Sequence, residues 1–184
     1  MRIGMKEYQK LAMRTSPRDG HDKIENGILG LIGETGELVD VLKKYKFQSG
    51  IAPELPKKQI AEELGDVLWY LAELLDGMDL WLIDIIGKDF SEIDKLMGRR
   101  SKRKISLDSA ILELCDRVSR MRRAIKRHNL ADMCSHIRYM IKVSAHIANL
   151  AGYTLEQVAQ MNIDKLKKRY PNGFDAGISM GRYM

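Results

Sequence analysis

The chain has 184 residues, of which 45% are hydrophobic, and this suits one globular domain with a core of its own. The N-terminus lacks an apolar signal segment, and four acidic residues interrupt the apolar stretch 67–87, so we expect neither a secretory signal nor a membrane span. The two cysteines, Cys115 and Cys134, have no metal-binding spacing and fit a reduced, cytoplasmic protein.

Helical spacing of apolar residues predicts an all-α protein, and a chain rich in Leu, Ile, Met and Ala agrees with this. Turn-forming residues separate the predicted helices at 15–22 and 47–55, and 101–105 is predicted to be a polar connector. The tail from Asp175 onward is expected to be loosely held. The predicted helices cover residues 4–13, 25–45, 56–76, 80–86, 107–128, 130–150 and 155–170.

The net charge is +6, and much of the positive charge falls in two clusters, at 95–104 and 117–127. We interpret the clusters as a solvated linker and a solvated helix face. Attraction of polyphosphate or nucleic acid is the alternative. We do not expect nucleic acid as a partner, because no aromatic residues are interleaved with the basic ones in an RNA-binding motif.

Two pairs of acids stand out in the second and third predicted helices. Glu34 and Glu37 are three positions apart, as are Glu63 and Asp66, so each pair shares one helix face among apolar neighbours. Four partly desolvated carboxylates repel one another, and their hard oxygen atoms suit Mg²⁺ or Mn²⁺. A solvated helix face with this spacing by chance is the alternative. The flanking glycines, at 33, 36 and 65, predict close helix approach or room for a ligand.

The segments that carry these acids, 30–38 and 62–70, resemble the two motifs of the MazG-like nucleoside triphosphate pyrophosphohydrolases, a family of the all-α NTP pyrophosphatase superfamily. The family pattern is E-E-x-x-E on one helix, followed by E-x-x-D on the next. The four acids match it, whereas the leading acid of the pattern falls on Gly33. The segment 6–15 is similar to the family's first helix, and 162–174 is similar to its closing motif.

The resemblance implies an all-α NTP pyrophosphatase bundle that uses Mg²⁺, or Mn²⁺, to cleave an NTP or dNTP between the α and β phosphates. The products would be the nucleoside monophosphate and pyrophosphate. The implied metal ligands are Glu34, Glu37, Glu63 and Asp66, with Glu37 and Glu63 as candidate catalytic bases. The closing motif implies substrate binding by Asn162, Lys165, Arg169 and Tyr170, with an ordinary basic helix end as the alternative.

A faint internal repeat divides the chain into two helical modules, since residues 92–96 are echoed by 162–166. We predict a first module at 1–104 that carries the acids and a second at 105–184 that ends in the phosphate-binding motif. The two would pack as one compact domain. An unrelated helical insertion is the alternative to a degenerate duplication. The first echo aligns Asp66 with His136. A fainter echo of residues 27–31 in 110–114 aligns acids 34 and 37 with Arg117 and Arg120, so the second module lacks these acids.

Two other functions fit the same residues. A dUTPase or dCTPase activity of the superfamily would differ only in the choice of base. A non-catalytic nucleotide-binding or assembly protein would fit the missing acid at Gly33 and would use the second half as an interaction surface. We expect a nucleoside triphosphate as ligand, no membrane partner, and a homodimer or a higher homo-oligomer.

Overall fold

The structure is a computed structural model, and it describes residues 3–16, 20–48, 50, 54–100 and 105–175. All secondary structure in these ranges is helical, which confirms the predicted fold class. No helix among them is long and apolar enough to span a membrane. The helices in chain order are α1 Met5–Met13, α2 Gly20–Phe47, α3 Lys57–Asp76, α4 Leu82–Ile86, α5 Phe90–Arg100, α6 Leu107–Lys126, α7 Leu130–Leu150 and α8 Leu155–Arg169.

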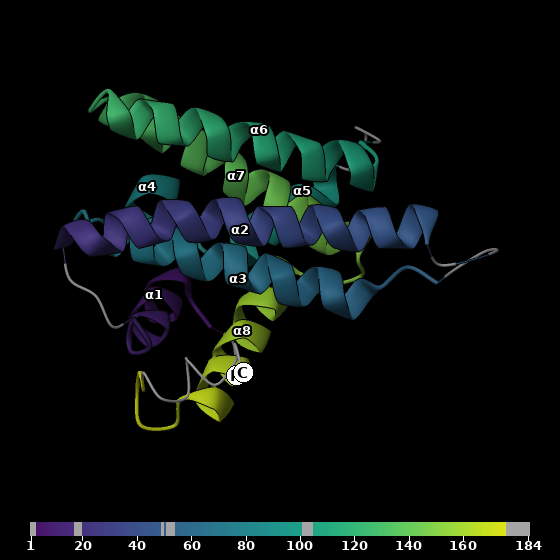
Figure 1. Cartoon of the computed structure of the whole chain (residues 1–184), viewed down its shortest axis with the longest axis horizontal. Helices are drawn as coiled ribbons and strands as arrows, with labels where there is room; N and C mark the ends of the chain where they lie inside the picture. The colour runs from purple at the N-terminus through teal and green to yellow at the C-terminus, as the bar shows by residue number, and fades with distance from the viewer. Residues whose placement is uncertain (1–2, 17–19, 49, 51–53, 101–104, 176–184) are drawn as a thin grey trace.

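The two longest helices of the first half, α2 and α3, form an antiparallel pair at the centre of the molecule (Figure 1). Two glycines of α2 allow this close packing. A Cβ atom at Gly27 would lie 2.8 Å from Cβ of Leu74, and one at Gly30 would lie 2.1 Å from the ring of Tyr70. Neither position can take a larger side chain unless the helices separate, so these two glycines fix the register of α2 against α3.

A second antiparallel pair, α6 and α7, covers one side of α2 (Figure 1). Side chains mark where these helices begin: Ser106 accepts a hydrogen bond from the backbone of Ser109, and Asn129 accepts one from Asp132. Lys46, near the end of α2, pairs with Asp108 in the first turn of α6. The buried apolar residues of both pairs belong to one continuous core, so the two halves of the chain pack as a single unit.

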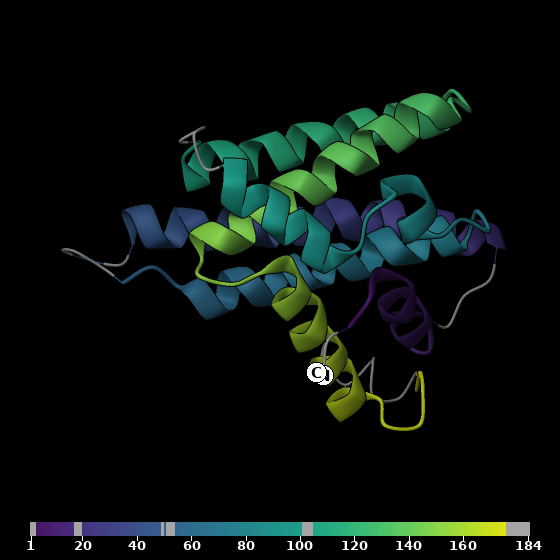
Figure 2. The same ribbon diagram turned by 180° about the vertical axis from the view of Figure 1, so that it is seen from behind.

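The helices that follow each pair cross over to the other pair. The eighth helix, α8, packs on α3, and α5 packs on α7 and against α8 (Figure 2). The two halves of the chain therefore show the same arrangement. In each half, an antiparallel pair (α2 and α3, or α6 and α7) is followed by a helix (α5 or α8) that packs on the second helix of the other pair. This packing agrees with the predicted duplication, which remains a prediction.

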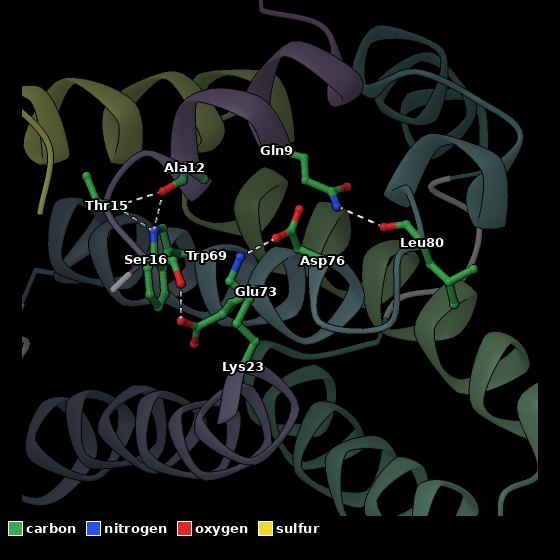
Figure 3. A network of polar contacts seen from close by, with 9 residues as sticks. All are labelled: Gln9, Ala12, Thr15, Ser16, Lys23, Trp69, Glu73, Asp76 and Leu80. Carbon is green, nitrogen blue, oxygen red and sulfur yellow. Dashed lines mark hydrogen bonds and ion pairs between the residues drawn. The ribbon is translucent and has the colours of Figure 1, made fainter. Parts of the chain in front are cut away.

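Polar contacts hold the first helix against α3 and against the segment that links α3 to α4 (Figure 3). The amide of Gln9 bonds to the carbonyl of Leu80 at 2.9 Å and accepts from the backbone of Leu82 at 2.8 Å. The indole N–H of Trp69 donates to Thr15 Oγ1 at 3.0 Å and to the carbonyl of Ala12 at 3.1 Å. These bonds place α1 beside α3 and α8, where it contacts the site described below.

Three expectations from the sequence are wrong in detail. Residues 20–22, predicted to lie in a turn, already belong to α2, and no helix was predicted where α5 lies. Of the two roles predicted for the glycines at 33 and 36, close helix approach is wrong, because a Cβ atom at either would meet no neighbour within 4 Å, and room for a ligand stays a prediction. The tail from residue 176 and the connector residues 101–104 lie outside the described residues.

Candidate active site

Three carboxylates meet where the middle of α2 faces the middle of α3. Glu34, Glu63 and Asp66 each offer a carboxylate oxygen, and these oxygens all lie within 4.8 Å of one another. Glu63 and Asp66 are three positions apart on α3 and so share a face, as their spacing predicts. Glu34 joins this group from α2. It lies one turn beyond Gly30, where α2 packs closely against Tyr70 of α3. We refer to the three as the acidic triad.

The electrostatics of the acidic triad favour a bound cation. Burial, followed by the negative charges of Asp66 and Glu63, raises the pKa of Glu34 from 4.5 to about 7. Burial and the charge of Asp66 also raise the pKa of Glu63. Carboxylates whose pKa values are raised in this way have too little compensating charge nearby, and a divalent cation with a preference for oxygen ligands can supply it. The donor set therefore fits Mg²⁺ or Mn²⁺.

The fourth predicted ligand, Glu37, lies outside the acidic triad. Its side chain is exposed on α2, one turn beyond Glu34. Its charge nevertheless contributes to the raised pKa values of Glu34 and Glu63, so it lies within electrostatic reach of both. The role of Glu37 as a metal ligand or base stays a prediction.

Two of the four predicted substrate-binding residues contact the acidic triad directly. The amide nitrogen of Asn162 donates to Asp66 Oδ1 at 3.0 Å, and the ammonium group of Lys165 contacts Asp66 Oδ2. Both residues lie on α8, three positions apart, on the face that packs against α3. Gly65 allows this approach, because a Cβ atom there would lie 3.0 Å from Cβ of Asn162.

The other two predicted substrate-binding residues lie farther along the chain. Arg169 follows Lys165 by one turn of α8, and its guanidinium lies 5.0 Å from the ring centre of Tyr170. Tyr170 is largely buried and packs against Phe174. Within the described part of the chain, neither residue shows a hydrogen bond or ion pair to the acids. Their role in substrate binding stays a prediction.

One residue of the site had no role in the sequence analysis. The hydroxyl of Tyr8, on α1, donates to Oδ1 of Asn162 at 3.0 Å. Tyr8 lies within the segment that resembles the family's first helix, but no local pattern indicates that it contacts a residue 154 positions away.

A hollow of about 230 Å³ opens beside the site, between α8 and the first half of α3. Its lining includes Lys165 and Asn162, so the hollow adjoins Asp66. The remaining lining residues carry both signs of charge and one apolar side chain: Lys58, Glu62, Met161 and Asp164.

Comparison with known proteins places these acids in a recognised segment. The family described as MazG nucleotide pyrophosphohydrolase domain matches residues 23–81, which include the acidic triad and Glu37. The chain is also 32% identical over 75 residues to the Gene 37 protein of Mycobacterium phage L5. This alignment covers 40% of the chain and 63% of the phage protein, less than two thirds of that relative's length. No solved structure matches the chain.

The fold and the site together define an all-helical protein with a carboxylate cluster suited to a divalent cation. The family match is more specific, because it covers both acid-bearing helices. The matched segment, residues 23–81, is similar to the MazG nucleotide pyrophosphohydrolase domain and makes up about a third of the chain. Over these residues, the match confirms the resemblance stated from the sequence.

Proposed function

We propose that the protein is a Mg²⁺-dependent nucleotide pyrophosphohydrolase that cleaves an NTP or dNTP between the α and β phosphates. The observation that carries this proposal is the acidic triad in the family-matched segment, with the cationic side chain of Lys165 in contact with it. Water would add to phosphorus, the bridging P–O bond would break, and the products would be the monophosphate and pyrophosphate.

The three acids of the triad would hold the cation. When bound, the cation would neutralise phosphate charge and activate water. Lys165 would pair with phosphate oxygens, and Arg169, one turn farther along α8, would bind the same chain of phosphates at a second point. Glu37, which stands outside the triad, keeps a carboxylate free to accept the proton of the attacking water. Glu63 is the alternative base, since burial and the charge of Asp66 raise its pKa.

One assay tests this proposal. The full chain is incubated with Mg²⁺ and a panel of canonical and deoxy nucleoside triphosphates, and the products are separated by ion-exchange chromatography. We expect monophosphate and pyrophosphate in equal amounts. Diphosphate and orthophosphate would show cleavage at the β–γ bond instead, and no product from any nucleotide would favour the non-catalytic binding protein. A strong preference for dUTP or dCTP would indicate the related dUTPase or dCTPase activity.

We also propose that the protein works as a homodimer in the cytoplasm. The outer face of α2 supports the dimer, because Leu29 and Ile32 are 62% and 46% exposed there. Glycines at 33 and 36 leave open space beside them. An apolar, flat stretch of helix of this kind suits packing against a second copy of the chain.

A further inference from the structure

Asp66 is connected to α1 by two successive hydrogen bonds through Asn162. Tyr8 donates to Asn162 Oδ1, and Asn162 Nδ2 donates to Asp66 Oδ1, each at 3.0 Å. We propose that Tyr8 and Asn162 are positioning residues that orient the carboxylate of Asp66 for cation binding. This inference rests on the proposed function, in which Asp66 is a metal ligand. It gives Asn162 a different role from the substrate contact that the closing motif implies.

The chemistry of the three groups determines the direction of both hydrogen bonds. An ionised carboxylate only accepts, so the NH₂ end of the Asn162 amide must face Asp66. The carbonyl end of the amide then faces Tyr8, whose hydroxyl can donate to it. Burial, with a further contribution from the charge of Asp66, raises the pKa of Tyr8 well above its usual range. The phenol therefore keeps the proton that this bond requires.

Both positioning residues are buried and held by their surroundings. Tyr8 is fully buried and packs edge-on against Phe90, with ring centres 5.8 Å apart. Asn162 is only 3% exposed, and both ends of its amide are already hydrogen-bonded within the chain. The backbone of Met5, one turn before Tyr8, is bound by Asp89 at 2.6 Å. Buried residues of α1 and α8 thus form both hydrogen bonds of the chain that ends at Asp66.

The two oxygens of Asp66 have partners of different kinds. Oδ1 accepts from the buried amide of Asn162, whereas Oδ2 contacts the ammonium of Lys165, whose side chain is 34% exposed. A long, partly exposed side chain can leave its partner at lower cost than a buried amide that makes two hydrogen bonds. We therefore assign Oδ2 as the oxygen that exchanges Lys165 for the cation, while Asn162 holds Oδ1. Removing the Tyr8 hydroxyl would release the amide and allow the carboxylate to rotate.

The test measures metal binding without nucleotide. Mn²⁺ is titrated into the metal-free full chain, and free Mn²⁺ is followed by electron paramagnetic resonance. Outer-shell partners of metal ligands typically contribute about 10–100-fold to affinity. We expect Tyr8→Phe to weaken Mn²⁺ binding about tenfold and Asn162→Ala somewhat more. The control is Tyr139→Phe, which removes a comparable hydroxyl bond to Glu113, of 2.6 Å, between α6 and α7. It should leave Mn²⁺ binding unchanged.

A second pair of variants covers the case in which Tyr8→Phe does not fold. Gly65→Ala adds a methyl group 3.3 Å from Nδ2 of Asn162, where it displaces the amide from Asp66. Gly36→Ala adds the same methyl group to α2 in open space. Both changes raise helix propensity by the same amount, because each replaces glycine with alanine inside a helix. Only Gly65→Ala should weaken Mn²⁺ binding, and a general effect on helix stability would not produce this difference.

The outcomes separate this inference from the proposed function. Mn²⁺ affinity that is lost in Asp66→Asn but unchanged in Tyr8→Phe and Gly65→Ala would overturn the positioning role alone. The same result, together with a raised KM for nucleotide in Asn162→Ala, would indicate that Asn162 contacts the substrate instead. A wild-type chain that binds no Mn²⁺, or binds it equally well after Asp66→Asn, would overturn both the metal site and the positioning role.

Discussion

The ammonium group of Lys165 contacts Oδ2 of Asp66, although 99 positions separate the two residues in the sequence. This contact brings a positive charge from α8 to the acidic triad of α2 and α3. In the absence of a cation, Lys165 compensates part of the triad's negative charge. When a cation and a phosphate chain are bound, the same ammonium group would be free to pair with the phosphates.

Lys165→Met should therefore change metal binding and catalysis in opposite directions. Without nucleotide, Mn²⁺ affinity should rise, because the competing ammonium is gone. With nucleotide, KM should rise and kcat should fall, since a hydrogen bond to a charged group is worth about 1.5–3 kcal/mol. Steady-state kinetics and Mn²⁺ titration measure the two effects. The matched control is Lys95→Ala on the exposed face of α5, which should change neither.

The acids of the triad should be essential for turnover but not for folding. We expect Glu34→Gln, Glu63→Gln and Asp66→Asn each to abolish most pyrophosphate release. Glu34→Gln and Glu63→Gln each remove one charge from a self-repelling cluster, so the metal-free chain should not lose stability in these two variants. Circular dichroism melting curves with EDTA check this point. Asp22→Asn, on an exposed position of α2, serves as the control. Near-normal Mg²⁺-dependent rates in two of the triad variants would show that the site is elsewhere.

The raised pKa of Glu34 predicts how stability depends on pH in the metal-free chain. Its pKa is about 7 in the folded chain against 4.5 for the free side chain, so between these values the folded state binds a proton that the unfolded state has released. Stability must then fall as pH rises from 4.5 to 7. Urea denaturation in EDTA at several pH values measures this fall, and Glu34→Gln should remove most of it. Mg²⁺ at pH 8 should restore stability to the wild type by binding the folded state. A flat profile for the wild type would contradict the predicted ionisation.

Local spacing in the sequence was sufficient to predict much of this site. Glu63 and Asp66 share a face because they are one helical turn apart on one helix, and the matching pair on α2 includes Glu34. Spacing alone did not show that Glu37 would lie outside the triad. That outcome depends on the register between α2 and α3, which Gly27 and Gly30 set through their contacts with the facing helix.

Long-range contacts are the part that the sequence did not reveal. No periodic pattern relates Tyr8 to Asn162, because only the packing of α1 beside α8 brings them together. The helix α5 was missed for a related reason. Its described buried residues are few, with Phe90 and Ile93 facing the core, so its amphipathic signal is short. Tertiary packing against α7 and α8 stabilises it instead.

The last prediction concerns assembly through the outer face of α2. Static light scattering of the wild type should give the mass of a homodimer at micromolar concentration. Ile32→Lys places a charge among the exposed apolar residues of that face and should shift the mass toward the monomer as the protein is diluted. Leu112→Lys is the matched control, because Leu112 is 60% exposed on α6, a different helix. A wild type that stays monomeric and fully active would exclude the dimer. Dissociation by Leu112→Lys but not by Ile32→Lys would indicate that the dimer interface lies on α6 instead of α2.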